Sequence, residues 1–259
     1  MNIVVCVKQV PDTEAPIRIR GDGRGIEEGG LTFVPNYYDE HAVEEALRIK
    51  ERLGGTVTLV TAGPGRAAEA LRAGLAMGAD QAIHVQDPAL DAADHIVLAR
   101  VLAAAIAPLS GDLILCGKLA TDDNAAIVGP AIAEFLGLPQ ATAVTRLELG
   151  QGAAQVHREV EGAVEVLEVS LPAVITVERG INEARYPSLP GIMKAKRTPI
   201  TVRTLADLGL GPGDLGPSRV ELLGLTPPPR RQAGRILEGE PAAVVAELVR
   251  LLREEAKVL

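Results

Sequence analysis

The first 140 residues alternate between two patterns of hydrophobic and polar positions. Short runs that are apolar or β-branched end in turn residues, and they predict strands at 2–10, 56–63, 81–87 and 112–118. The segments between and after them carry apolar residues at i, i+3, i+4 and i+7, which predicts amphipathic helices at 39–54, 65–79, 91–109 and 122–137. This alternation favours an α/β fold in which helices cover both faces of a parallel sheet.

The pattern changes near residue 140. Four runs of alternating polar and apolar residues are joined by short turns and predict antiparallel strands added to the sheet edge, at 142–149, 153–160, 163–170 and 173–178. A stretch rich in Gly and Pro follows at 208–234, and an amphipathic helix at 241–259 closes the chain. Because its apolar stripe needs a surface, we expect this arm to wrap around another subunit. The predicted units are an α/β domain at 1–200 and a C-terminal arm with its helix at 201–259.

Composition narrows the function classes. The 259 residues carry a formal charge of −8, which argues against nucleic acid as the main partner. No apolar run approaches the roughly 18 residues of a membrane span, and the chain starts without a basic leader, so we expect a cytoplasmic protein without membrane insertion. Cys6 and Cys116 lie in apolar runs. This favours buried thiols over a disulfide, a metal pair or a nucleophile.

Strand ends are where a parallel sheet binds ligands, at the point where the strand order reverses. Cys6 and Lys8 end the first predicted strand, and Gly117 and Lys118 end the fourth. We expect Gly117 to let a ligand approach the backbone and Lys118 to offer a cation. Residues 122–124 come at the start of a predicted helix, whose free N–H groups favour an anion. An ordinary helix capped by Asp is the alternative, and no GxGxxG or GxxxxGK[ST] motif occurs.

The segment before the first helix is a second candidate. Asn36, Tyr37 and Tyr38 offer a flat apolar surface and an amide, as a purine requires, or they simply close the edge of the core. We expect His41 to lie on the surface. The other histidines share no metal-like spacing, and no Ser–His–Asp set is visible, so the sequence favours a carrier or binder over a hydrolase.

The segment 185–200, "RYPSLPGIMKAKRTPI", is basic, stiffened by prolines and partly apolar. Leu189, Ile192 and Met193 follow no regular period there, so we interpret it as a loop. By composition alone it is a solvated connection or a contact site.

Six segments carry a resemblance to a known family. They are "VCVKQVPDT" at 5–13, "NYYDEHAVEEALRIKE" at 36–51, "VTAGP" at 60–64, "LRAGLAMGAD" with "IHV" at 71–85, "CGKLATDD" with "VGPAIAEFLGLP" at 116–139, and "INEARYPSLPGIMKAK" at 181–196. The last is the most specific. Together they run nearly end to end, and the chain resembles the beta subunits of electron-transfer flavoproteins.

The resemblance implies an adenine-nucleotide alpha-hydrolase-like fold and a heterodimer. In this family the alpha subunit holds most of the FAD, and the beta subunit binds AMP. Carried over by motif, the AMP contacts are Cys6, Asn36, Tyr37, Tyr38, Asp39, Ala62, Gly117, Lys118, Leu119, Ala120, Thr121, Asp122, Asp123, Asn124, Ala125, Ala126, Ile127 and Val128.

The resemblance also implies a recognition loop at 182–197 that docks dehydrogenases, with Leu189 as its anchor. Its prolines lower the entropy lost on docking, and its cations steer acidic partners. The implied partners are the alpha subunit, acyl-CoA or other flavin dehydrogenases of fatty acid oxidation, and an acceptor such as a quinone oxidoreductase. The subunit itself would have no catalytic residues. The docking residues are Arg185, Tyr186, Leu189, Ile192, Met193, Lys194, Lys196 and Arg197.

Two departures from the family pattern matter. Residues 125–128 are apolar where many members carry polar side chains, so backbone N–H groups would hold the phosphate. Thr13 stands where some members place a tyrosine near the flavin. A family branch that binds a second FAD in place of AMP and bifurcates electrons is one alternative. A stress-protein-like nucleotide sensor is another, although it would lack the recognition loop and the arm.

Overall fold

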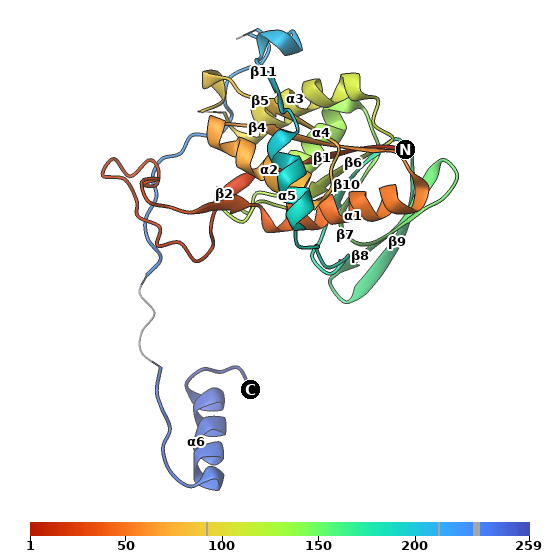
Figure 1. Ribbon diagram of the computed structural model, residues 1–259. Coiled ribbons are helices and arrows are strands. Elements are labelled where there is room, and N and C mark those ends of the chain that lie inside the picture. The colour runs from red at the N-terminus through yellow and green to blue at the C-terminus, as the bar shows by residue number, and fades with distance from the viewer. Residues whose placement is uncertain (92, 212, 230–233) are drawn as a thin grey trace.

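A nine-stranded sheet forms the centre of the molecule (Figure 1). The computed structural model describes residues 1–91, 93–211, 213–229 and 234–259, so small parts of the expected third helix and of the arm lie outside the described residues. The strand order is β11-β5-β4-β1-β6-β10-β7-β8-β9, and the strands from β11 to β7 are parallel. The strands are β1 (Asn2–Cys6), β4 (Thr56–Ala62), β5 (Gln81–Val85), β6 (Leu113–Gly117), β7 (Gln140–Leu149), β8 (Ala153–Val160), β9 (Ala163–Ser170), β10 (Ala173–Val177) and β11 (Thr201–Arg203).

Helices cover both faces of this sheet, as the sequence predicts. On one face, α1 (Tyr37–Leu53), α2 (Ala68–Met77) and α5 (Leu189–Arg197) share a core cluster with the sheet. On the other face, α3 (His95–Ile106) and α4 (Val128–Leu136) share a second cluster. Side chains of β1 alternate between the two: Ile3 and Val5 enter the first cluster, and Val4 and Cys6 the second. Two further short strands, β2 (Gln9–Pro11) and β3 (Phe33–Pro35), form a separate antiparallel pair.

The expected antiparallel additions are confirmed for β8 and β9, which form the green hairpin of Figure 1. For β7 the expectation is confirmed on one side only, because β7 pairs antiparallel with β8 and parallel with β10. For the last run it is wrong. β10 lies between β6 and β7 and is parallel to both, and all five of its residues are buried. A strand with helices on both sides is apolar throughout rather than alternating, and "AVITV" has that pattern.

Two helix assignments also need correction. The helix expected from residue 122 begins at Val128, because Asn124 and Ala126 adopt left-handed φ angles of 52° and 54°, which interrupt a right-handed helix. The expected loop at 185–200 contains α5. Leu189, Ile192 and Met193 stand at i, i+3 and i+4, a helical spacing that the neighbouring prolines obscure.

Local signals explain why α5 forms despite Pro190. The Ser188 side chain caps the helix by accepting a hydrogen bond from Gly191 N. Pro190 lies in the first turn, where its missing N–H would have no intrahelical partner. Gly191 lets the helix approach α2, since a Cβ there would lie 2.3 Å from the carbonyl oxygen of Ala76. Arg72 of α2 donates to the carbonyls of Ala195 and Thr198 and so holds the far end of α5.

The first residues of the predicted C-terminal unit, 201–205, pack on the main sheet. β11 joins the main sheet beside β5, and Leu205 is buried in the second core cluster. The last helix, α6 (Pro241–Glu254), exposes Val245, Leu248 and Val249, and it has no buried residue. Figure 1 draws α6 apart from the sheet. Within the described ranges, no helix has both the length and the apolarity needed to cross a membrane.

Candidate functional site

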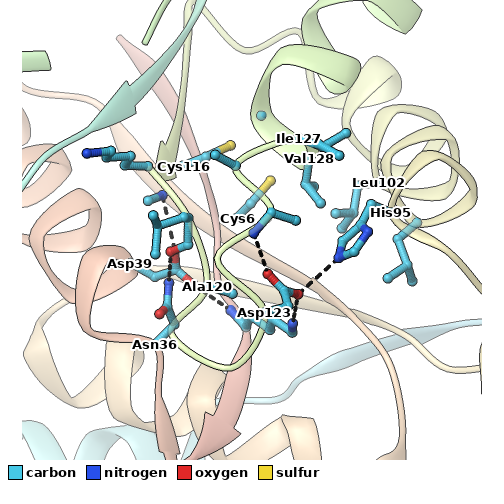
Figure 2. Close-up of a pocket in the computed structure, with 18 of the residues that line it drawn as sticks. Cys6, Asn36, Asp39, His95, Leu102, Cys116, Ala120, Asp123, Ile127 and Val128 are labelled. Carbon is cyan, nitrogen blue, oxygen red and sulfur yellow. Dashed lines mark hydrogen bonds and ion pairs between the residues drawn. The ribbon is translucent and has the colours of Figure 1, made fainter. Parts of the chain in front are cut away.

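A pocket opens at the carboxyl ends of β1 and β6. These neighbouring strands mark the place where the chain order reverses, since β4 and β5 extend the sheet from one side of β1 and β6 from the other. The start of α3 and the loop that joins β6 to α4 complete the wall (Figure 2). The enclosed part has a volume of about 110 Å³. A cavity therefore lies at the edge of the sheet where the topology predicts a ligand site.

Asp39 and Asn36 hold the floor of the pocket together. The Asp39 carboxylate accepts a hydrogen bond from Lys8 N at 2.7 Å and another from Gly117 N at 3.0 Å, which ties the end of β1 to that of β6. Asn36 donates to the carbonyl of Leu119 at 2.8 Å and accepts from Thr121 N at 3.1 Å. These two side chains lie at the start of α1. They shape the pocket by fixing the backbone at the ends of β1 and β6 and in the loop after β6.

Asp39 is also electrostatically unusual. Burial raises the pKa of its carboxyl to about 7, against the opposing effect of the two backbone N–H donors.

An ion cluster stands at the pocket mouth. Lys8 Nζ lies 2.8 Å from Asp122 Oδ1 and 2.8 Å from Asp123 Oδ2. His95 Nε2 lies 3.0 Å from the same Asp123 oxygen (Figure 2). Burial opposes the charge on Asp123, but hydrogen bonds from Lys8, Ala125 N and His95 lower its pKa overall. The charged groups of the cluster are therefore paired with one another.

The loop before α4 presents backbone rather than side chains. Ala126 has a φ of 54°, and Ile127 follows with φ −100° and ψ −35°. Successive residues of opposite hand turn their N–H groups toward one concave side, and such nests bind anions. The free N–H groups at the start of α4 add to this effect. The loop can hold a phosphate although its side chains at 125–128 are apolar.

The rest of the wall is apolar. Leu102 of α3 lies across the cavity from Cys6 and Cys116, with Ile127 beside it (Figure 2). Leu98 of α3 lines the same pocket. Both cysteines are buried and free, as the sequence predicts. A hydrogen bond with Cys6 and burial raise the pKa of the Cys116 thiol, so it remains protonated and is a poor nucleophile.

Gly117 also has a packing role that the sequence did not indicate. A Cβ at this position would lie 2.3 Å from Asp39 Oδ1 and 2.7 Å from Tyr38 Cβ. The missing side chain thus makes room for α1, while Gly117 itself lines the pocket. Lys118, expected to offer a cation, also lines the pocket, and its Nζ lies 2.5 Å from Glu178 Oε2.

The pocket gathers most of the expected contact residues. The side chains of Tyr37, Tyr38, Thr121, Asp122 and Asn124 do not line it. Tyr37 instead packs edge-on against Tyr38 and His41. The residues that line it as expected are Cys6, Asn36, Asp39, Ala62, Gly117, Lys118, Leu119, Ala120, Asp123, Ala125, Ala126, Ile127 and Val128.

Sequence reasoning missed the wall that α3 supplies, which includes His95, Leu98 and Leu102. A signal was present, because α3 follows β5 and its first turn must lie at the carboxyl edge of the sheet. It also missed that His41 is buried: its Nδ1 lies 3.0 Å from Asn182 Oδ1.

The expected docking residues lie outside the pocket, on and before α5. Tyr186 is 96% exposed, and Leu189 is 79% exposed. Met193 and the cations Lys194, Lys196 and Arg197 are exposed as well. Arg185 is the exception, since its guanidinium pairs with Glu44 and Glu51 of α1.

The fold and pocket define an α/β protein with a cavity at the switch point of a parallel sheet. A family model, the electron transfer flavoprotein domain, matches residues 25–208. The chain is 44% identical to the electron transfer flavoprotein subunit beta of Bacillus subtilis (strain 168), with 100% of both chains covered. It is 39% identical to the subunit of the same name from Syntrophomonas wolfei, covering 100% of this chain and 98% of the relative. It is 40% identical to that from Bradyrhizobium diazoefficiens, with 100% of both covered. The chain belongs to the electron transfer flavoprotein family, among its beta subunits.

Proposed function

We propose that this chain is the beta subunit of a heterodimeric electron-transfer flavoprotein. In this proposal it binds AMP as a structural ligand and helps to enclose the FAD that an alpha subunit holds. It also docks dehydrogenases through α5, so that electrons pass from them to the respiratory chain or another acceptor. The observation that carries the structural role of AMP is that the titratable side chains of the pocket already have partners. Its titratable groups Lys8, Asp39, His95, Lys118 and Asp123 are each bonded to another group of the chain. Such a site favours holding a ligand over transforming it.

The shape of the pocket suits an adenine nucleotide. The apolar wall made by Leu98, Leu102 and the two cysteines matches the face of a base. The nest at Ala126 and the start of α4 match a phosphate. The enclosed volume of about 110 Å³ is below the roughly 300–1,000 Å³ of pockets that bury a whole drug-sized ligand. The base would therefore be enclosed, and the ribose phosphate would lie along the loop.

The flavin belongs to a site shared with the alpha subunit. FAD, when bound, supplies the electron acceptance and donation that the family name describes. The role we assign to this chain is to contribute surface, to bind AMP and to present α5. The C-terminal arm and α6 fit this arrangement, because the exposed Val245, Leu248 and Val249 make an apolar stripe suited to a partner surface.

The docking role rests on α5. An exposed leucine beside exposed cations is an arrangement suited to brief, specific contacts: the apolar anchor supplies affinity, and the charges raise the encounter rate. A carrier that serves several dehydrogenases needs a contact of this kind.

The experiment is co-expression with the alpha subunit, purification of the complex, and extraction and identification of its nucleotides. We expect one AMP and one FAD per heterodimer, and no AMP hydrolysis or transfer. Turnover of AMP, or a complex without adenine nucleotide beyond the one FAD, would contradict the AMP role. If the complex contains two FAD and no AMP, the pocket holds a second flavin in place of AMP, as in the bifurcating branch.

The chain alone provides a second test. We expect it to bind no flavin stoichiometrically and to self-associate through the stripe on α6. A monodisperse monomer saturated with FAD would contradict the assignment of the flavin to the alpha subunit.

A further inference from the structure

Helix α1 grips the segment that leads into α5. We name residues 182–185 the docking root. The carboxylate of Glu44, whose side chain is 3% exposed, accepts hydrogen bonds from Arg185 Nε at 2.7 Å, Nη2 at 3.2 Å and backbone N at 3.2 Å. Glu51, about two turns further along the same face of α1, accepts hydrogen bonds from Nη1 and Nη2 of the same guanidinium. Arg185 is thus clamped between two carboxylates of one helix, which fixes its direction as well as its charge.

A second set of contacts holds the other end of the docking root. The buried Asn182 donates from Nδ2 to the carbonyl of His41 at 3.0 Å and to Glu45 Oε2 at 3.0 Å. Its Oδ1 lies 3.0 Å from His41 Nδ1. Arg48 of α1 reaches the carbonyl of Glu183 at 3.2 Å. Side chains from three turns of α1 therefore fix the side chain or backbone of residues 182, 183 and 185.

An exposed segment follows directly after these contacts. Tyr186, Pro187 and Ser188 are exposed, and Leu189 is the first residue of α5. At its far end α5 is held by Arg72 of α2. The helix is consequently fixed from both ends, and Leu189 stands at the end nearest the docking root. Leu189 therefore lies between two attachments, the docking root on α1 and the close approach of Gly191 to Ala76 of α2.

We propose that Glu44, Arg185 and Asn182 are positioning residues for docking: they hold the docking root on α1 and so orient Leu189 for its partner. The inference rests on the proposed function, because it concerns the same docking helix. Preorganisation reduces the ordering that binding must impose. Loosening the root should therefore weaken association with a dehydrogenase and leave electron transfer within the docked complex unchanged.

The test uses the assembled heterodimer with Glu44→Gln, Arg185→Gln and the double variant. We expect each single change to raise the apparent KM of a dehydrogenase for the heterodimer at least tenfold, with kcat within twofold and flavin content unchanged. Because the two side chains act as one unit, the double variant should be no worse than the poorer single one. Hydrogen exchange of the full chain should speed up across residues 182–197 and stay constant in β1 and β6.

Matched variants separate this role from a general loss of stability. Glu51→Gln removes the exposed carboxylate of the clamp and should raise KM less than threefold. Arg185→Lys keeps the charge but loses the fork geometry, and it should remain defective. Asn182→Ala tests the second set of contacts if Glu44→Gln does not fold.

The outcomes distinguish this inference from the proposed function. If Leu189→Ala abolishes docking while Arg185→Gln and Asn182→Ala leave KM within twofold, docking stands and the positioning role is overturned. A fall in kcat in parallel with melting temperature, at constant KM, also overturns it. If Leu189→Ala has no effect on docking, the docking role fails, and the positioning role fails with it.

Discussion

The pocket and α5 are both held by side chains of α1, but the two regions differ in how much of their surface is already bonded within the chain. In the pocket, side chains of α1 such as Asp39 turn inward and bond the backbone of two strands, so the cavity is preformed and its polar groups are satisfied. At α5, side chains of α1 hold only the root, and Leu189 and Met193 beyond it remain exposed to water. A permanent ligand suits the first arrangement and a transient partner suits the second. The difference is that the polar groups of the pocket already have hydrogen-bond partners before a ligand binds, whereas Leu189 and Met193 of α5 leave most of their surface uncovered.

The pH response should separate the two regions most strongly. The folded pKa of Asp39, about 7, lies above its ordinary value of 3.8, so the protonated form favours the fold. The contribution of Asp39 to stability should fall as pH rises from about 4 to about 7, by up to ~1.4 kcal/mol per pH unit, and level off above that. Comparing the melting temperatures of the native protein and Asp39→Asn across this range checks the sign. The infrared band of a protonated carboxyl, absent in Asp39→Asn, should disappear near pH 7.

The docking root should respond with the opposite sign. Burial opposes the charge on Glu44, yet hydrogen bonds from Arg185 and Arg48 lower its pKa overall from 4.5. Its contribution is present above that pH and is lost as the pH falls further. Exchange rates at residues 182–185, corrected for intrinsic pH effects, should rise only below about pH 4.5. A root that loosens between pH 5 and 7 would contradict this account.

Gly117→Val should be the most damaging single substitution in the pocket. The new Cβ would meet Asp39 Oδ1 at 2.3 Å and Asp39 N at 2.9 Å, so α1 must move away from β6. Overpacking and the strained Asp39 bonds together should cost about 3 kcal/mol, and the nucleotide content should fall. Gly29→Val, at a position with nothing within 4 Å, is the control. Unchanged melting temperature in Gly117→Val would show that the contact is not tight.

Leu189→Ala should affect docking without affecting the fold. Roughly 2 kcal/mol of lost anchor burial corresponds to a factor of about 30 in binding, so dehydrogenase-dependent flavin reduction should fall severely. Reduction by dithionite, AMP content and melting temperature should not change. Leu53→Ala, at a leucine that is 53% exposed on α1, is the matched control. If Leu189→Ala lowers stability as much as turnover, Leu189 is a packing residue.

The exposed cations of α5 should give the smallest effect. Lys194→Gln or Arg197→Gln should slow association with an acidic dehydrogenase severalfold at low ionic strength. The effect should vanish in added salt, since charges are screened beyond about 10 Å at 0.1 M. Stopped-flow association rates over a salt series measure this. Arg146→Gln, on the exposed face of β7, should show no such salt dependence.

The sequence predicts the pocket better than the docking helix for a physical reason. Cys6, Gly117 and their neighbours end apolar strands, and parallel topology alone brings those ends to one edge. The position of β10 between β6 and β7 depends on long-range pairing that no local pattern encodes. His41 is buried by Asn182, which lies 141 positions away. Pro187 and Pro190 hide the helical spacing of α5, although a proline in a first turn is compatible with a helix.

Photolabelling with 8-azido-AMP tests most directly whether the nucleotide binds at the sheet edge between β1 and β6. The heterodimer is refolded with the probe, irradiated, digested and mapped by mass spectrometry. The account predicts one adduct, at the pocket wall formed by residues 6–8, 98–102 or 116–129, and its loss when unlabelled AMP is present in excess. An adduct elsewhere that AMP displaces, for example on residues 185–200, would contradict the claim that the sheet edge between β1 and β6 is the nucleotide site.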